Sequence, residues 1–426
     1  MANNFYFWIY IFISLFLIGF SFKVFKQWFN PLSIYSLIFL LAVIFNFLLP
    51  IYQPQTSTWL VLISSLLIFA FGSIWGVHVG LKKKIFSISE EEKEKKYQIL
   101  SLVSLTLTAG YIVAFIWFNK ETFVDLFSYG FNSFFYRAYN SYMRSQYRTF
   151  GYFEGMIPLL SLYVGILDGL RRKVHKRTIL FLILITAFAF FTGLRTILFI
   201  SLGIYASCYL LFLFRNQNQI KKVANKKKFG FLLILILGLA VLIWITYGRA
   251  PFSGGDIGLK EANFKDMVFL EAGGHIARLS YFLEEKEQLN LSRGALTLGP
   301  LMRTICRLNN PPDFCAEKFP HDQPKAQIPF TWVGGTYLMA LYADFGILGI
   351  IFGPFLLGWF SSFAWMQALR GNLFQLELAS IMLVFIINSF RFALTFAGNF
   401  FLMLVLCILF NWGYKILIYF FNKHFA

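Results

Sequence analysis

Charged residues are scarce in this sequence. Asp, Glu, Lys and Arg make up 14% of 426 positions, whereas hydrophobic residues make up 58%. The apolar runs between the charges repeatedly reach or approach the roughly 20 residues that cross the hydrocarbon of a bilayer. One such run could be the core of a soluble domain, but about ten of them cannot. The sequence therefore predicts an all-α polytopic membrane protein.

Acidic residues are scarcer than basic ones, with 20 Asp and Glu against 38 Lys and Arg and a net charge of +18. In a soluble protein such an excess would suggest a nucleic-acid partner. In a membrane protein it has a simpler cause, because cytoplasmic loops are enriched in Lys and Arg. We therefore expect membrane lipid, and no nucleic acid, around this chain.

Several familiar patterns are missing. The sequence has no repeat of 20 to 50 residues, no heptad pattern and no low-complexity block. It has no His-x-x-x-His, no Asp-x-Asp and no Cys/His quartet at ligand spacing, so we expect neither a metal site nor a cofactor. The first apolar run, Phe5–Phe22, lacks a basic leader and an Ala-x-Ala exit, which predicts a retained span and no cleaved signal.

The basic clusters fix the predicted orientation, because they belong on the cytoplasmic side. Placing them there gives about eleven spans, within a range of ten to twelve, with the N-terminus outside and the C-terminus inside. The predicted spans are Phe5–Phe22, Leu32–Ile51, Trp59–Leu81, Gln98–Phe118, Phe150–Leu170, a hairpin of two short helices in Thr178–Phe214, Phe229–Tyr247, Tyr342–Trp365, Leu373–Phe390 and Gly398–Phe420.

Three parts follow from this assignment. Residues 1–247 hold eight spans and an outer loop at 119–148. Residues 248–341 form a large extracytoplasmic loop between spans 8 and 9, and residues 342–426 hold the last three spans. The charged run Ser87–Lys96 is expected to be a solvated linker.

Four cysteines are present. Cys208 and Cys407 lie in predicted spans, and we expect them to be inert packing residues. Cys306 and Cys315 flank Asn309–Pro312 on the predicted outer side, where an oxidising compartment allows a disulfide. Such a bond would close a short loop in the 248–341 segment.

Ten of the fifteen arginines map to the predicted outer side or to outer helix ends, against the usual bias. Because Arg grips phosphate with two parallel bonds and stays charged when partly desolvated, this face is expected to bind an anion. Arg195 and Arg391 interrupt apolar hairpins; they either face an interior cavity or extend to the lipid headgroups. The ten are Arg137, Arg144, Arg148, Arg195, Arg249, Arg278, Arg293, Arg303, Arg307 and Arg391.

The 119–148 loop contains an arginine stripe. Arg137, Arg144 and Arg148 are spaced for one face of a helix, with Tyr142 among the tyrosines between them. Such a helix could rest on anionic lipid. The use of Arg and not Lys favours a wall that binds glycan and phosphate.

Glu271, His275 and Arg278 have the spacing i, i+4 and i+7, which places them on one face of a helix. A carboxylate that orients a histidine is a general-base arrangement. A surface helix with an ordinary salt bridge would have the same spacing. His321, followed by Asp322, is a second candidate.

Several motifs resemble the O-antigen polymerases, also called oligosaccharide repeat-unit polymerases. They are the hairpin tip Thr192–Thr196, the large outer loop, Arg144 with Gly155 after ten intervening residues, and Gly335–Leu338 leading into Tyr342–Gly349 and then Gly358. The related O-antigen ligases have a His-x10-Gly pattern at the end of the large loop. Here Gly335 stands where that histidine would be if Gly346 is the glycine, which favours a polymerase.

The resemblance implies a GT-C-type glycosyltransferase fold in the bacterial inner membrane, with its active site facing the periplasm. It implies transfer of a growing glycan from undecaprenyl diphosphate to the terminal sugar of an incoming repeat unit, with inversion, and a chain-length regulator protein as a further partner. An O-antigen ligase and a flippase of lipid-linked oligosaccharides are the alternatives.

Site roles follow from this chemistry. We expect Arg195 and Arg278 to stabilise the pyrophosphate leaving group and one of Glu271, His275 or Asp344 to be the base. The residues expected to bind substrate are Arg137, Tyr142, Arg144, Arg148, Arg249, Arg293, Arg303, His321, Tyr337 and Arg391.

Overall fold

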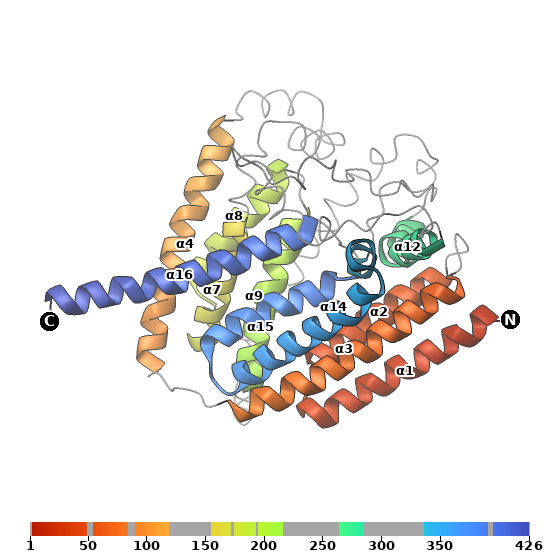
Figure 1. The fold of residues 1–426 in the computed structure, drawn as a ribbon. Coiled ribbons are helices and arrows are strands. Elements are labelled where there is room, and N and C mark those ends of the chain that lie inside the picture. The colour runs from red at the N-terminus through yellow and green to blue at the C-terminus, as the bar shows by residue number, and fades with distance from the viewer. Residues whose placement is uncertain are drawn as a thin grey trace, which may run out of the picture. The chain divides into compact units, whose positions relative to one another are not determined.

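The computed structural model of the protein describes residues 2–48, 54–83, 90–118, 155–171, 174–192, 195–215, 264–284, 336–390 and 395–425. Within these ranges the regular secondary structure is entirely helical (Figure 1). The helices are α1 (Ala2–Phe25), α2 (Pro31–Leu48), α3 (Thr56–Lys82), α4 (Glu90–Phe118), α7 (Met156–Arg171), α8 (Lys176–Thr192), α9 (Arg195–Arg215), α12 (Phe264–Glu284), α14 (Tyr337–Leu369), α15 (Leu373–Asn388) and α16 (Thr395–Phe425).

Six of the described helices are long and apolar enough to cross a membrane: α1, α2, α3, α4, α14 and α16. Apolar stretches of α9 and α15 are shorter, at Ile197–Phe212 and Leu373–Asn388. Many large apolar side chains of the long helices are exposed, among them Trp8, Trp117 and Ile347. Exposed apolar surface of this extent suits contact with lipid, and the protein is a polytopic membrane protein.

The predicted spans agree with helices wherever the structure describes them. The two helices expected in Thr178–Phe214 are confirmed as α8, which ends at Thr192, and α9, which begins at Arg195. The predicted linker Ser87–Lys96 was wrong in part, because α4 already begins at Glu90. Predicted span Phe229–Tyr247 lies outside the described residues.

The chain divides into two compact units, and each is composed of several separate stretches. Unit 1 comprises residues 1–84, 256–367 and 385–398. Unit 2 comprises residues 85–255, 368–384 and 399–426.

In unit 1, helix α2 begins at a capping box. The side-chain Oδ1 of Asn30 accepts a hydrogen bond from the backbone N of Ser33 at 3.0 Å, and Ser33 Oγ accepts one from the backbone N of Asn30 at 3.2 Å. These two bonds satisfy amide groups that have no partner inside the helix. The first turn of α2 is thereby fixed where the chain returns from α1.

Helices α3 and α14 of unit 1 approach each other closely through glycine. A Cβ atom on Gly72 would lie 2.2 Å from the carbonyl O of Phe355, and one on Gly76 would lie 2.2 Å from the carbonyl O of Trp359. On α14, a Cβ on Gly358 would lie 2.3 Å from the carbonyl O of Phe69. Small residues at four-residue spacing allow such contact between membrane helices.

Helix α14 is broken at Gly346, whose φ of 59° and ψ of −141° are not helical. Glycine reaches this conformation without a steric penalty. The two parts pack against each other, because a Cβ on Gly349 would lie 2.1 Å from the carbonyl O of Leu341. The helix begins at Tyr337, five residues before the predicted span, so Tyr342–Phe345 precede the break.

Unit 2 is built around α7 and α9. A Cβ on Gly165 would lie 3.0 Å from Cys208 Cβ, and one on Gly169 would lie 2.4 Å from Phe212 Cδ2. These pairs are one helical turn apart on each helix, so they mark a continuous seam. On α15, Val384 Cγ2 lies 3.2 Å from the Cβ position of Gly203.

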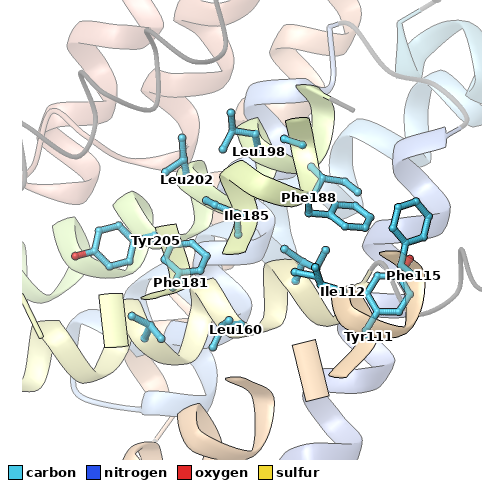
Figure 2. Packing of buried hydrophobic residues seen from close by; sticks show 14 residues of the cluster. Tyr111, Ile112, Phe115, Leu160, Phe181, Ile185, Phe188, Leu198, Leu202 and Tyr205 are labelled. Atoms are coloured by element: carbon cyan, nitrogen blue, oxygen red, sulfur yellow. The ribbon is translucent and has the colours of Figure 1, made fainter. Parts of the chain in front are cut away.

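Helices α4 and α8 complete this core with aromatic rings (Figure 2). The ring centroid of Phe188 lies 5.4 Å from that of Phe115 and 5.7 Å from that of Tyr111. Such tilted aromatic pairs contribute beyond their buried area. The packing holds α4, α7, α8 and α9 together around one aromatic core.

Candidate functional site

Helix α12 carries three of the predicted catalytic residues, Glu271, His275 and Arg278. The predicted helix is confirmed over this stretch, which lies inside the segment expected to be a large loop. The side chains of Ile276, Leu279 and Phe282 are buried. The helix is therefore packed into unit 1.

The packing of α12 depends on one glycine and one serine. A Cβ on Gly273 would lie 2.4 Å from the backbone N of Asn46, so the backbones of α12 and α2 touch. Ser280 Oγ accepts hydrogen bonds from Thr58 Oγ1 at 2.8 Å and from the backbone N of Gln55 at 3.2 Å, at the start of α3. Helix α12 is thus held against the last turn of α2 and the start of α3.

His275 lies on the packed face of α12 and is 3% exposed. Its ring stands edge-on to Phe390, with 5.9 Å between the centroids. An imidazole held on several sides keeps one orientation, which a general base requires. The side chain of Glu271, its predicted partner, lies outside the described residues.

Arg278 is partly buried one turn further along α12. Burial lowers the pKa of its guanidinium below the ordinary value. An arginine keeps its charge even so. A desolvated, charged guanidinium is suited to bind phosphate, because the surrounding protein does not screen the interaction as water would.

The first part of α14 lies beside this region of α12. The Phe282 ring packs edge-on against Tyr342, with 6.3 Å between the centroids. Asp344 follows two residues later, is 1% exposed and lies two residues before the break at Gly346. His275, Arg278 and Asp344 thus belong to one unit and to two helices that touch.

Tyr337, expected to bind substrate, is buried in unit 1 at the start of α14. Its hydroxyl shares a hydrogen bond of 2.8 Å with the hydroxyl of Tyr35, and its backbone N donates to the carbonyl O of Ser389 at 2.9 Å. Both bonds fix the position at which α14 begins. A role in binding substrate stays a prediction.

Arg195 is the first residue of α9, in unit 2. The first turn of a helix carries free amide groups and a partial positive charge, so an arginine there adds to a positive potential. This location fits the predicted hairpin tip. The arginine side chain itself lies outside the described residues.

The other predicted site residues lie outside the described part of the chain, and their roles stay predictions. They are Arg137, Tyr142, Arg144, Arg148, Arg249, Arg293, Arg303, His321 and Arg391, together with the predicted disulfide partners Cys306 and Cys315.

Sequence reasoning missed a buried carboxylate in unit 2, Glu377 of α15, which is fully buried. Its Oε1 accepts a hydrogen bond from the Tyr97 hydroxyl. Its Oε2 accepts bonds from Cys407 Sγ at 2.9 Å and from Asn411 Nδ2 at 2.6 Å. Lys96 Nζ lies 3.8 Å from Oε1 and also donates to Asn411 Oδ1.

These five residues, called the Glu377 cluster below, join α4, α15 and α16. A buried carboxylate requires such donors and a counter-charge, since it would otherwise be very costly to desolvate. Cys407 therefore does more than the packing expected of it. The signal in the sequence was a single acidic residue inside an apolar run, which is rare in membrane helices and usually has a partner.

A second network missed from the sequence lies at the turn between α7 and α8. Asp168, which is 1% exposed, accepts from Thr178 Oγ1 and, at 2.9 Å, from the Tyr205 hydroxyl. His175 Nδ1 lies 2.9 Å from the other Asp168 oxygen, and His175 Nε2 lies 3.0 Å from Arg171 NH1. Asp168 too is a lone acid inside an apolar run.

Among the described residues, no group of three or more His, Cys, Asp or Glu side chains could hold a metal ion. Comparison with known proteins found no match to a family of proteins, to a curated protein sequence or to a solved structure.

Proposed function

We propose that the chain is a polymerase of lipid-linked oligosaccharide repeat units, of the O-antigen or capsule type. It would have a GT-C-type fold of about eleven spans and act in the bacterial inner membrane with its site toward the periplasm. The observation that carries the proposal is Arg278, a charged and partly desolvated guanidinium on a helix that also holds His275 and that packs against the helix of Asp344.

The chemistry of the proposed reaction needs these residue types. The acceptor hydroxyl attacks the anomeric carbon, the bond from that carbon to the phosphate oxygen breaks, and undecaprenyl diphosphate leaves with the electron pair. A base takes the hydroxyl proton, for which Glu271, His275 and Asp344 are the candidates. Arginines stabilise the negative charge that develops on the leaving oxygen, and Arg195 and Arg278 are our first candidates.

The test is a reaction with purified components. The protein in nanodiscs is mixed with lipid-linked repeat units, and products are separated by size. Glycans of two or more repeat units, still attached to lipid, support the polymerase. In a parallel reaction to which lipid A core is added, transfer only to that acceptor would indicate a ligase. Unchanged glycan length would overturn the proposal.

A lipid-linked oligosaccharide transporter is a second candidate, and the break in α14 favours it. Broken helices near buried polar groups are typical of secondary transporters. Gly346 breaks α14 two residues after the buried Asp344. Against it, the sequence has no internal repeat of the kind that many transporters show. Movement of lipid-linked glycan across vesicles without a change of length would support the transporter.

A further inference from the structure

Four charged or titratable side chains form a line that begins at Glu94 of α4, passes through Arg171 of α7 and His175 just before α8, and ends at Asp168 of α7. Glu94 Oε1 accepts a hydrogen bond from Arg171 Nε at 2.6 Å, Arg171 NH1 lies 3.0 Å from His175 Nε2, and His175 Nδ1 lies 2.9 Å from Asp168 Oδ1. We call these four residues the α7–α8 relay. All four residues belong to unit 2, and the proposed reaction assigns a role to none of them.

The partners fix the protonation of His175. A guanidinium only donates hydrogen bonds, so at its contact with Arg171 the His175 Nε2 must be the acceptor and carry no proton. The single proton of the neutral ring is then on Nδ1, from which it is donated to Asp168. The relay in this form requires a neutral histidine.

Other groups around His175 leave this conclusion intact. The cations Lys176 and Arg177 are on α8, and the hydroxyls of Tyr205 and Tyr209 are on α9 near Asp168. Arg177 NH1 donates to the carbonyl O of Gln98 at 2.8 Å and to Ser101 Oγ at 2.7 Å, so it is committed to α4. Arg172 and Lys173 lie outside the described residues.

We propose that the α7–α8 relay is a proton-operated switch, in which protonation of His175 releases Arg171. A proton from water adds to the free electron pair of Nε2, and the new N–H then faces the guanidinium at contact distance. Two cations cannot share that contact, so Arg171 leaves His175, while the imidazolium keeps its bond to Asp168. Arg177 holds α8 on α4 through neutral acceptors at any pH, so release is confined to the end of α7.

The solvent exposure of the relay and the pH range in which histidine ordinarily changes charge both fit such a switch. The side chains of Glu94, Arg171 and His175 are 40%, 26% and 17% exposed, so water reaches the relay. Histidine is the side chain that ordinarily changes charge between about pH 5 and 8. The turn follows a basic end of α7, which by the charge rule faces the cytoplasm, so the switch would respond to cytoplasmic acidity.

The first test is the tautomer of His175, read by nitrogen NMR of the full-length protein with ¹⁵N-histidine in nanodiscs. At pH 8 we expect a signal with a protonated Nδ1 and an unprotonated Nε2. It should be absent in His175→Gln and present in His78→Gln, a matched change on the exposed face of α3. At pH 5 both nitrogens should carry protons. A pH 8 signal with the proton on Nε2 would overturn the proposal.

The second test is hydrogen exchange of the backbone around residues 168–178 at pH 8 and pH 5. Glutamine can accept from Arg171 and donate to Asp168 without titrating, so His175→Gln should keep its protection at both values. Relative to that variant, the wild type at pH 5 should lose protection about two- to fivefold, equivalent to about 0.4–1 kcal/mol.

Arg171→Gln removes the cation and serves as the second variant. Its backbone around residues 168–178 should be less protected than that of His175→Gln at both pH values. If the protection against hydrogen exchange changed equally with pH in the wild type and in His175→Gln, the proposal would be overturned. If His175→Gln fails to fold, the tautomer in the wild type and the exchange of Arg171→Gln still decide the matter.

Discussion

Gly273 of α12 lies against the backbone of Asn46 of α2, so closely that a Cβ atom would stand 2.4 Å from the amide N. This contact fixes the distance between the helix of His275 and Arg278 and the remainder of unit 1. A methyl group there must push α12 outward, because backbone atoms cannot move aside as the end of a side chain can.

Gly273→Ala is therefore expected to impair the proposed reaction more than stability. A displacement of about 1 Å can cost about 100-fold in rate when it moves positioned groups. Gly110→Ala on α4 is the matched control, since no atom lies within 4 Å of its Cβ position. Glycan polymer yield and thermal unfolding, measured for both variants, check this. Equal activity of the two variants would contradict it.

Arg278→Ala should lower the rate of polymerisation by about 100- to 1000-fold, the usual loss when one stabilising donor is removed from a transition state. Arg278→Lys should recover little, because an ammonium group cannot form two parallel bonds to phosphate. Arg370→Ala, at an exposed turn between α14 and α15, is the control. Initial rates at saturating repeat unit are the measurement. A rate within about twofold of wild type would remove Arg278 from the mechanism.

Gly346→Ala should destabilise the protein by about 1–3 kcal/mol, because an alanine cannot adopt the observed φ of 59° and ψ of −141° without strain. Gly413→Ala on α16 has open space around it and should leave stability unchanged or slightly higher. Denaturant unfolding in detergent would distinguish the two. A neutral Gly346→Ala would mean that α14 is not broken at this residue.

Glu377→Ala should destabilise unit 2 by about 3–5 kcal/mol, because Lys96 and the three neutral donors of the Glu377 cluster lose their common acceptor. Glu377→Gln should cost less, since it still accepts hydrogen bonds. Glu91→Gln is the control, because Glu91 lies on the exposed start of α4, the helix that also carries Lys96. This change should have no measurable effect on stability. Unfolding midpoints that do not separate Glu377→Ala from Glu91→Gln would show that the cluster contributes nothing to stability.

The helices were predictable because apolar runs of membrane length have few other solutions, and basic clusters separate several of these runs. The hairpin of α8 and α9 follows from the same reasoning, with Arg195 and the preceding glycine as its interruption. The six long spans therefore needed no tertiary information. The start of α4 at Glu90 was missed because the charged run Ser87–Lys96 was interpreted as a solvated linker, although the helix includes most of it.

What could not be predicted depends on contacts between distant residues. The spacing of Glu271, His275 and Arg278 predicted a helix. It did not predict that Gly273 would allow this helix to pack directly against the backbone of α2. The motif around Gly346 gave no sign that the chain breaks there, since φ is set by packing on both sides. Glu377 and Asp168 were visible as lone acids in apolar runs, yet their partners come from helices remote in sequence.

The central claim is that this chain joins lipid-linked repeat units by means of arginines and a base. It is tested most directly by incubating the purified protein, and its Arg278→Ala and Arg195→Ala variants, with one defined lipid-linked repeat unit. The account predicts lengthened lipid-linked glycan with the wild type and a loss of about 100-fold or more with either variant. Glycan of unchanged length with folded wild-type protein would contradict it.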